Sequence, residues 1–171
     1  SAFTYTFFER ALEQAKEAEA AYQRGDPRPL EGIPTVIKDL HPVAGEITTW
    51  GSKIYEGVPA EYTVPTVQRL FDAGIIMHAR STTSEFSHTG HGHSPLWGVT
   101  RNPWNLDMSP GGSSAGAGAA HAIFSRNLRR RRARWFFRGG AGANAFYRLL
   151  GIPHLIVDGG FFVSTGTDTP A

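Results

Sequence analysis

The stretch Ser109-Pro110-Gly111-Gly112-Ser113-Ser114-Ala115-Gly116-Ala117-Gly118 is the most informative part of this sequence. Its paired glycines precede small residues that predict a helix over residues 113–123, with Ser113 or Ser114 as its cap. Glycines before a helix let the backbone approach a ligand closely and leave N–H groups that can contact it. The same spacing also fits a tight turn before a closely packed helix. Both interpretations stay open at the level of spacing alone.

Two well-known loop motifs do not fit this stretch. A phosphate-binding loop needs a lysine directly after its glycines, and none is present. A nucleophile elbow places a serine between two glycines at a strand-to-helix turn. Residues 112–116 contain such a serine, but no strand is predicted before them.

Strand and helix patterns alternate upstream of this stretch. Residues 32–39 predict a short buried strand that ends in charged residues, and residues 75–79 predict a second one. Between them, residues 65–73 predict a helix with proline in its first position. A longer amphipathic helix is predicted over residues 3–24, with Thr4 as its N-cap. This alternation favours an α/β fold.

Residues 29–114 contain a series of further motifs. In chain order they are residues 29–39, Gly45 with residues 48–52, Val67 and Leu70 with Ala73-Gly74, residues 84–86, residues 100–105 and the Ser-Pro-Gly-Gly-Ser-Ser run at 109–114. In their order and separations these motifs resemble the amidase signature family. The resemblance covers residues 1–123, which is only the N-terminal part of the family's much longer domain. It implies a partial amidase-signature fold, α/β, with a mixed central sheet flanked by helices. It also implies a small-molecule amide substrate and no cofactor.

The resemblance further implies a catalytic apparatus of one lysine and two serines. A buried lysine at the position of Lys38 is the general base, because burial disfavours the charge of its amine. A serine at the position of Ser113, often after a cis peptide bond, relays the proton, and a second serine attacks the amide carbonyl. Gly111, Gly112 and Ser114 are implied to shape the substrate-binding part of the site. Taken without the family, Lys38 has a plainer interpretation as a strand-end lysine in a surface salt bridge with its neighbour in the chain.

The nucleophile of this apparatus is missing from the sequence. In the family it lies about two dozen residues after the relay serine, in an Asp-x-Gly-Gly-Ser-x-Arg run that also supplies oxyanion-hole N–H groups. Here Gly139-Gly140 aligns with the paired glycines only with a short insertion, which places Ala141 at the nucleophile position, and no Asp precedes the pair. No Ser or Thr occurs over residues 126–163, and Ser125 comes too early. We therefore find no nucleophile and expect no acyl-enzyme by the family's route.

The chain changes character after Ser125. Residues 1–125 carry 9 Lys or Arg and 13 Asp or Glu, whereas residues 126–171 carry 8 Arg and 2 Asp. We expect residues 1–125 to be the N-terminal portion of an amidase signature domain and residues 126–171 to be a divergent Arg- and Gly-rich tail. A shifted reading frame, an internal deletion and a natural pseudoenzyme would each explain the tail, and we rank them in that order. The C-terminal part of the family's domain is absent from this chain. If that part normally covers the sheet, Val36, Ile75 and Ile76 are expected to face water.

Two further features have competing interpretations. His88, His91 and His93 form a tract typical of weak metal binding. They fall inside the family-like segment, however, so we expect no metal site. The basic run at residues 129–138 is typical of nucleic-acid binding, but it also fits an artefactual tail. We expect no nucleic-acid partner.

The composition limits the class of protein and the kinds of site that this chain can have. A chain of 171 residues with 40% hydrophobic and 19% charged residues is typical of a soluble globular domain. The absence of cysteine excludes disulfides, thiolate metal sites and a Cys nucleophile. No apolar stretch approaches the roughly 20 residues of a membrane span, and no signal peptide is evident. We expect a cytoplasmic protein without a membrane partner.

The sequence thus predicts an amidase signature hydrolase that cleaves carboxamide C–N bonds, truncated and inactive as written. An enzymatic alternative is the glutaminase-type subunit of an aminoacyl-tRNA amidotransferase. A non-enzymatic alternative is a binding domain with a basic tail.

Overall fold

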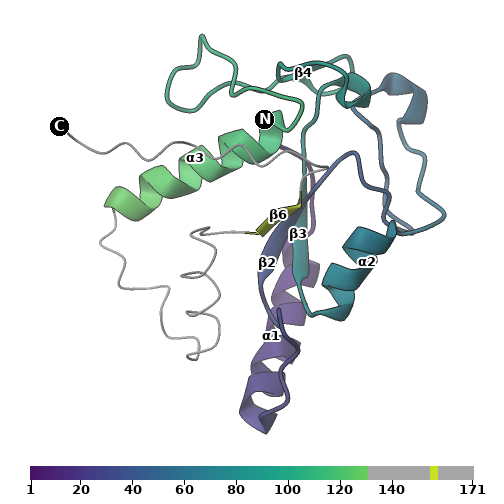
Figure 1. Cartoon of the computed structure of the whole chain (residues 1–171), viewed down its shortest axis with the longest axis vertical. Helices are drawn as coiled ribbons and strands as arrows, with labels where there is room; N and C mark the ends of the chain where they lie inside the picture. Colours follow the sequence, from purple (N-terminus) through teal and green to yellow (C-terminus); the bar gives the residue numbers. More distant parts are fainter. Residues whose placement is uncertain (131–154, 158–171) are drawn as a thin grey trace.

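The computed structural model describes residues 1–130 and 155–157, with side chains as far as residue 122 (Figure 1). Its elements, in chain order, are β1 (Phe3–Thr6), α1 (Phe8–Arg24), β2 (Pro34–Lys38), the 3₁₀ helix η1 (Lys53–Tyr55), α2 (Pro65–Asp72), β3 (Ile76–Ser81), the 3₁₀ helix η2 (Glu85–Ser87), β4 (His93–Ser94), β5 (Gly98–Val99), α3 (Ala115–Arg130) and β6 (Leu155–Val157). This alternation of strands and helices confirms the predicted α/β class.

The central sheet is mixed, as predicted. Its strand order is β1-β3-β2-β6. Strand β2 runs parallel to both β3 and β6, whereas β1 runs antiparallel to β3. Lys38 pairs in register with Ser81, so the ends of β2 and β3 lie side by side. Because the carboxyl ends of parallel strands meet at one edge of a sheet, the segments that follow β2 and β3 gather there.

Helices α2 and α3 lie on opposite sides of β2 and β3 (Figure 1). The main core lies on the α2 side, where Val67 of α2 packs with Ile37 of β2. The expectation that Val36, Ile75 and Ile76 face water is wrong, since all three are buried. Ile75 belongs to the main core, and Val36 is paired with β6 on one side and β3 on the other.

The predicted helix over residues 3–24 is wrong at its start. Residues Phe3–Thr6 form β1, and α1 begins at Phe8 with Phe7 rather than Thr4 at the N-cap. Phe, Tyr and Thr suit a strand, and pairing with the free edge of β3 satisfies the backbone N–H and C=O groups that face β3. The predicted end is correct, because Gly25 adopts a left-handed conformation with φ of 80°.

The predicted small-residue helix is α3, which begins at Ala115 and continues to Arg130, past the expected end at residue 123. Strand β6 is the described part of the apolar stretch over residues 149–157. The expected nucleophile position, Ala141 after Gly139-Gly140, lies outside the described residues, as does most of the Arg- and Gly-rich tail. Within the described part of the chain, no helix is long and apolar enough to cross a membrane.

Candidate active site

Lys38, the last residue of β2, is buried beside the two serines that precede α3. It is 2% exposed. Its Nζ donates hydrogen bonds to Ser113 Oγ at 2.7 Å and to Ser114 Oγ at 2.9 Å. The structure therefore brings together three of the residues singled out in the sequence. The plainer interpretation, a surface salt bridge with Asp39, does not fit, because neither side chain reaches the surface.

The turn that carries the serines is built from glycine. The Gly112–Ser113 peptide bond is cis, and Gly111 has a φ of 86°. A Cβ on Gly112 would lie 2.6 Å from the backbone oxygen of His91, so no side chain fits there. The Ser113 carbonyl accepts a 3.3 Å hydrogen bond from the Ser84 N–H. These contacts fix the turn against the segment that follows β3.

Small residues let α3 approach the end of β3. The Gly116 N–H donates to the Thr82 carbonyl at 3.1 Å. A Cβ on Gly116 would collide with the Ala2 carbonyl oxygen and with the Thr82 backbone nitrogen. Ala115 and Ala117, on either side of Gly116, are buried as well. The predicted close packing of this helix thus places Ser113 and Ser114 within reach of Lys38.

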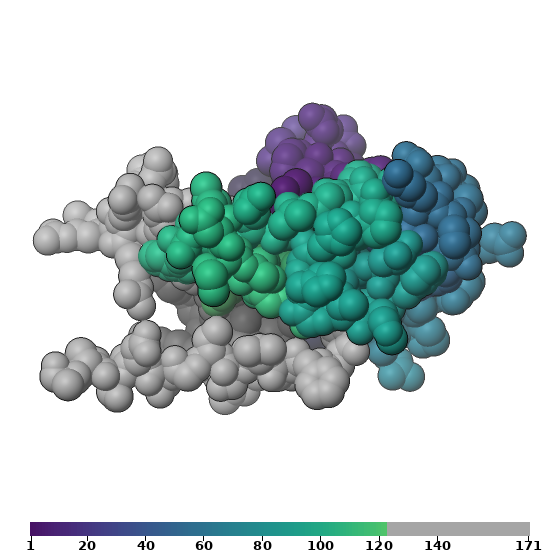
Figure 2. All heavy atoms as spheres, turned by 90° about the horizontal axis from the view of Figure 1, so that it is seen from above, coloured from purple at the N-terminus to yellow at the C-terminus, as the bar shows by residue number. Residues whose placement is uncertain are grey.

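Four consecutive residues with hydroxyl side chains lie at the end of β3, beside this turn. Residues 81–84, Ser-Thr-Thr-Ser, are all buried. The Thr82 and Thr100 hydroxyls share a 2.7 Å hydrogen bond, and Ser84 Oγ donates to the Thr89 carbonyl at 3.0 Å. Within the described part of the chain, the Ser81 hydroxyl has no hydrogen-bond partner. Viewed from above, the segment between β3 and α3, coloured teal to green, covers this end of the molecule (Figure 2).

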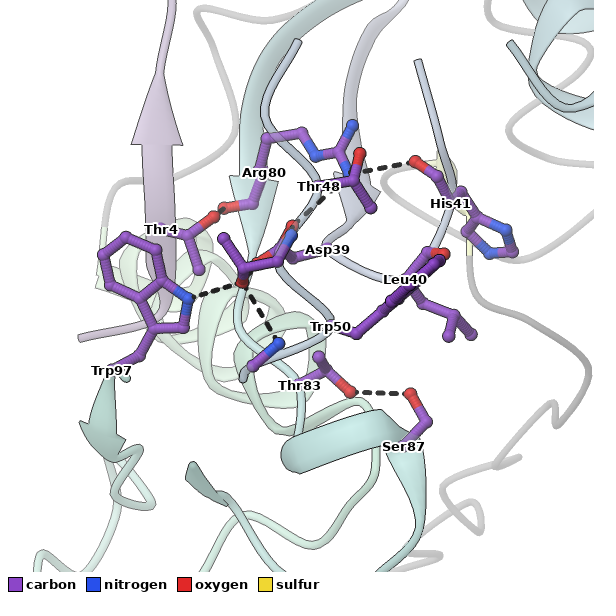
Figure 3. Close-up of polar contacts among 12 residues, drawn as sticks. Thr4, Asp39, Leu40, His41, Thr48, Trp50, Arg80, Thr83, Ser87 and Trp97 are labelled. Atoms are coloured by element: carbon purple, nitrogen blue, oxygen red, sulfur yellow. Dashed lines mark hydrogen bonds and ion pairs between the residues drawn. The ribbon is translucent and has the colours of Figure 1, made fainter. Parts of the chain in front are cut away.

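A second buried polar cluster lies at the end of β2, and the sequence interpretation missed it (Figure 3). Asp39 and Arg80 are both 0% exposed, and Arg80 Nη2 lies 3.5 Å from Asp39 Oδ1. Asp39 accepts hydrogen bonds from the backbone N–H of Thr49, at 2.9 Å, and from the Thr49 hydroxyl. The available sequence signal was an arginine, Arg80, directly after the predicted buried strand over residues 75–79.

Burial sets the electrostatics of this cluster. It raises the pKa of the Asp39 carboxyl, whereas the hydrogen bonds from Thr49 and the charge of Arg80 oppose that rise. Burial likewise lowers the pKa of the Arg80 guanidinium, and the charge of Asp39 opposes that change. Each charge therefore makes the burial of the other less costly.

Residues 1–126 match the family model described as Amidase. The chain belongs to the amidase family. It is 46% identical over 121 residues to a glutamyl-tRNA(Gln) amidotransferase subunit from Brachyspira hyodysenteriae (strain ATCC 49526 / WA1), a match that covers 71% of this chain and 25% of that relative. The chain thus spans about a quarter of the length of the curated relatives it matches.

Solved amidase structures show the same fold. The native peptide amidase from Stenotrophomonas maltophilia superposes with a TM-score of 0.63 at 32% identity, covering 70% of this chain and 26% of that one. A structure reported as a vestigial protein complex that reveals the evolutionary origins of an s-triazine catabolic enzyme gives a TM-score of 0.66 at 36% identity. It covers 71% of this chain and 27% of that one. The resemblance inferred from the motifs is thereby confirmed.

This amidase-family chain has two further features, the histidine tract and an open cavity. The His91 and His93 rings lie 6.2 Å apart, and His88 is exposed. Among the described residues, no group of three or more His, Asp or Glu side chains is arranged to hold a metal ion. An open cavity between Arg10, Arg28 and Met77 contains none of the residues singled out for catalysis.

Proposed function

We propose that residues 1–122 form the proton-transfer half of an amide-hydrolysing site. Lys38 is the general base, and Ser113 relays protons between Lys38 and the nucleophile. The observation that carries this proposal is the 2.7 Å hydrogen bond from a buried lysine amine to the Ser113 hydroxyl. A serine hydroxyl becomes nucleophilic only when a positioned base accepts its proton, and this pair supplies such a base.

The proposed reaction proceeds through an acyl-serine. The nucleophile hydroxyl gives its proton to Ser113 Oγ as the Ser113 proton moves to the Lys38 amine, and the freed oxygen attacks the carboxamide carbon. Collapse of the tetrahedral intermediate breaks the C–N bond and returns a proton to the departing amine. Water then cleaves the ester by the same relay. Ser114 holds the Lys38 amine in place, and Gly111 with Gly112 shapes the carbonyl-binding side.

The nucleophile has to come from beyond the described residues. No Ser or Thr occurs over residues 126–163 of this chain. We therefore propose that the chain as written does not form the acyl-enzyme. We also propose residues 126–171 to be a divergent tail on the amidase portion, residues 1–125. Translation of the gene's other reading frames tests a frame shift, because a shifted frame must contain an Asp-x-Gly-Gly-Ser run. Its absence from every frame excludes that origin.

Linear carboxamides are the proposed substrate class. The similarity to a solved peptide amidase supports an amide hydrolase. A second candidate is a glutaminase-type subunit, which the 46% identity to a glutamyl-tRNA(Gln) amidotransferase subunit favours. In that case the ammonia released from glutamine is passed to an aminoacyl-tRNA, and the chain works in a complex.

A chimera tests the proposal. Residues 1–122 of this chain are joined to the remaining part of the Brachyspira relative, and ammonia release is measured from glutamine and from a series of simple primary amides. We expect the chimera to be active and Lys38→Ala to lower kcat/KM by about 10³-fold, as expected for loss of a positioned base. A preference for glutamine favours the second candidate. The intact chain is expected to release no ammonia.

The control is Lys53→Ala, which removes the same charge from an exposed lysine. Activity that Lys38→Ala leaves unchanged contradicts the proposal. If this chimera does not fold, a second one built on the Stenotrophomonas peptide amidase serves the same purpose, because that protein shares the fold.

A further inference from the structure

Asp39, the residue after the proposed base, belongs to a buried cluster that takes no direct part in the proposed reaction. We propose that Asp39 and Thr49 form a clamp, together with Arg80 and Trp97, that positions Lys38 for proton transfer with Ser113. This inference rests on the proposed function. Asp39 directly follows β2, and Figure 3 shows it together with Arg80 and Trp97.

The backbone on the C-terminal side of Lys38 is held at three points. The Lys38 carbonyl accepts from the His41 N–H at 3.1 Å. The Asp39 N–H donates to the Ser81 carbonyl at 3.0 Å, and the Asp39 carbonyl accepts from the Trp50 N–H at 3.1 Å. The position of the Lys38 Cα therefore depends on the positions of Asp39 and of the loop that follows β2.

The Thr49 hydroxyl is at the centre of the hydrogen bonds that hold Asp39 and the loop after β2. It donates to the Asp39 carboxylate and accepts from Trp97 Nε1 at 3.0 Å and from the Gly51 N–H at 3.1 Å. A hydroxyl has one proton to donate and two lone pairs, so all its hydrogen-bonding capacity is used. Because Thr49 is 0% exposed, water cannot replace any of these partners at the surface.

Arg80 supplies the counter-charge and ties the clamp to the neighbouring strand. Its Nη2 donates to the His41 carbonyl at 2.9 Å and to Thr48 Oγ1 at 3.1 Å, besides its contact with Asp39. His41 is thus bound to β2 through its own N–H and to β3 through Arg80. A buried ion pair is costly to break, because the remaining charge stays uncompensated.

The sheet geometry makes Asp39 a positioning residue rather than a catalytic one. Arg80 pairs in register with Ile37, and Lys38 pairs with Ser81. Since successive side chains of a strand point to opposite faces, Asp39 and Arg80 lie on the face away from Ser113. Asp39 therefore acts through the placement of Lys38. A displacement of about 1 Å at such a base lowers a rate on the order of 100-fold.

The intact chain allows a direct test, because it has only three lysines, Lys16, Lys38 and Lys53. Lysine labelled with ¹³C at Cε gives three NMR signals, which a Lys38→Met variant assigns. Thr49→Val removes the central hydroxyl at nearly constant volume. We expect it to shift or split the Lys38 signal and to leave the two exposed lysines unchanged. Thr49→Ser keeps the hydroxyl and is expected to restore the original signal.

Val67→Ala is the control for a merely structural effect. Val67 is fully buried in the main core on the α2 side, so this variant destabilises the fold without removing any hydrogen bond of the clamp. Spectra are recorded well below each variant's Tm. A Lys38 signal that is unchanged in Thr49→Val, or moved equally by Val67→Ala, overturns the inference. If Thr49→Val does not fold, Trp97→Phe removes one donor to Thr49 and is expected to cause a smaller shift of the Lys38 signal.

The clamp and the proposed amide-hydrolysing function can be rejected independently of each other. The NMR experiment needs no turnover, so it reports on the clamp even if the chimera is inactive. In an active chimera, Thr49→Val is expected to lower kcat by roughly 10- to 100-fold with little change in KM, since the clamp affects the base and not substrate binding.

Discussion

At the scale of single residues, the site depends on positions where no side chain fits. Glycine within a helix costs about 1 kcal/mol relative to alanine, yet α3 has Gly116 in its first turn. There the backbone of α3 lies directly against the Ala2 carbonyl and Thr82. That close approach fixes the start of the helix relative to Lys38, and so it outweighs the helical preference for alanine.

Gly116→Ala is therefore expected to destabilise the fold by about 2 kcal/mol, within the range for overpacking. Gly118→Ala is the matched variant in the same helix. Gly118 is exposed, and a Cβ there would meet only the Pro110 carbonyl oxygen, at 3.3 Å. We expect that substitution to be neutral or slightly stabilising. Urea unfolding of both variants checks the difference, and equal effects would contradict the packing argument.

At the scale of elements, an ion pair in the loop between α1 and β2 connects that loop to α1 and α2. Arg28 contacts the Glu31 carboxylate through Nε at 2.6 Å and through Nη2 at 2.8 Å, and its Nη1 donates to the Phe71 carbonyl at the end of α2. Tyr22 of α1 donates to the Glu31 carbonyl. The hydrogen bonds from Arg28 lower the pKa of Glu31 below its usual value, against the opposing effect of burial.

A lowered pKa in the folded state fixes the direction of the pH dependence. Glu31 stabilises the fold above its unfolded-state pKa, and that contribution is lost as the pH falls from about 4.5 through the lower folded value. We expect Glu31→Gln to have a lower Tm than the original chain at pH 7, and the gap to narrow as the pH falls below 4.5. Thermal unfolding between pH 7 and pH 3 measures the gap. A gap that stays constant over that range rules out this role.

The element scale also shows where sequence patterns stop being informative. The α/β class, α2, β3 and the small-residue helix follow from local periodicity and from glycine and proline positions. The start of α1 does not, because Phe3–Thr6 suits either helix or strand and its pairing with β3 decides the outcome. The Asp39–Arg80 pair could not be predicted from the sequence either, because it depends on the register between β2 and β3, which shifts between Thr35 and Val36.

At the scale of the whole molecule, the candidate site joins two motifs that are far apart in the sequence. The family resemblance predicted both Lys38 and Ser113, and the fold places them in hydrogen-bonding contact. Their catalytic roles stay predictions, as does the missing nucleophile, whose expected region lies outside the described residues. The chain spans about a quarter of the length of its curated relatives.

The central claim is that Lys38 and Ser113 act as one proton-transfer unit, and a double-mutant cycle in the active chimera tests it most directly. Residues that act as a unit give strongly non-additive losses. We predict that Lys38→Ala and Ser113→Ala each lower kcat/KM by about 10³-fold, and that the double variant is no slower than the slower single variant. Losses that multiply in the double variant, or full activity in either single variant, would contradict the account.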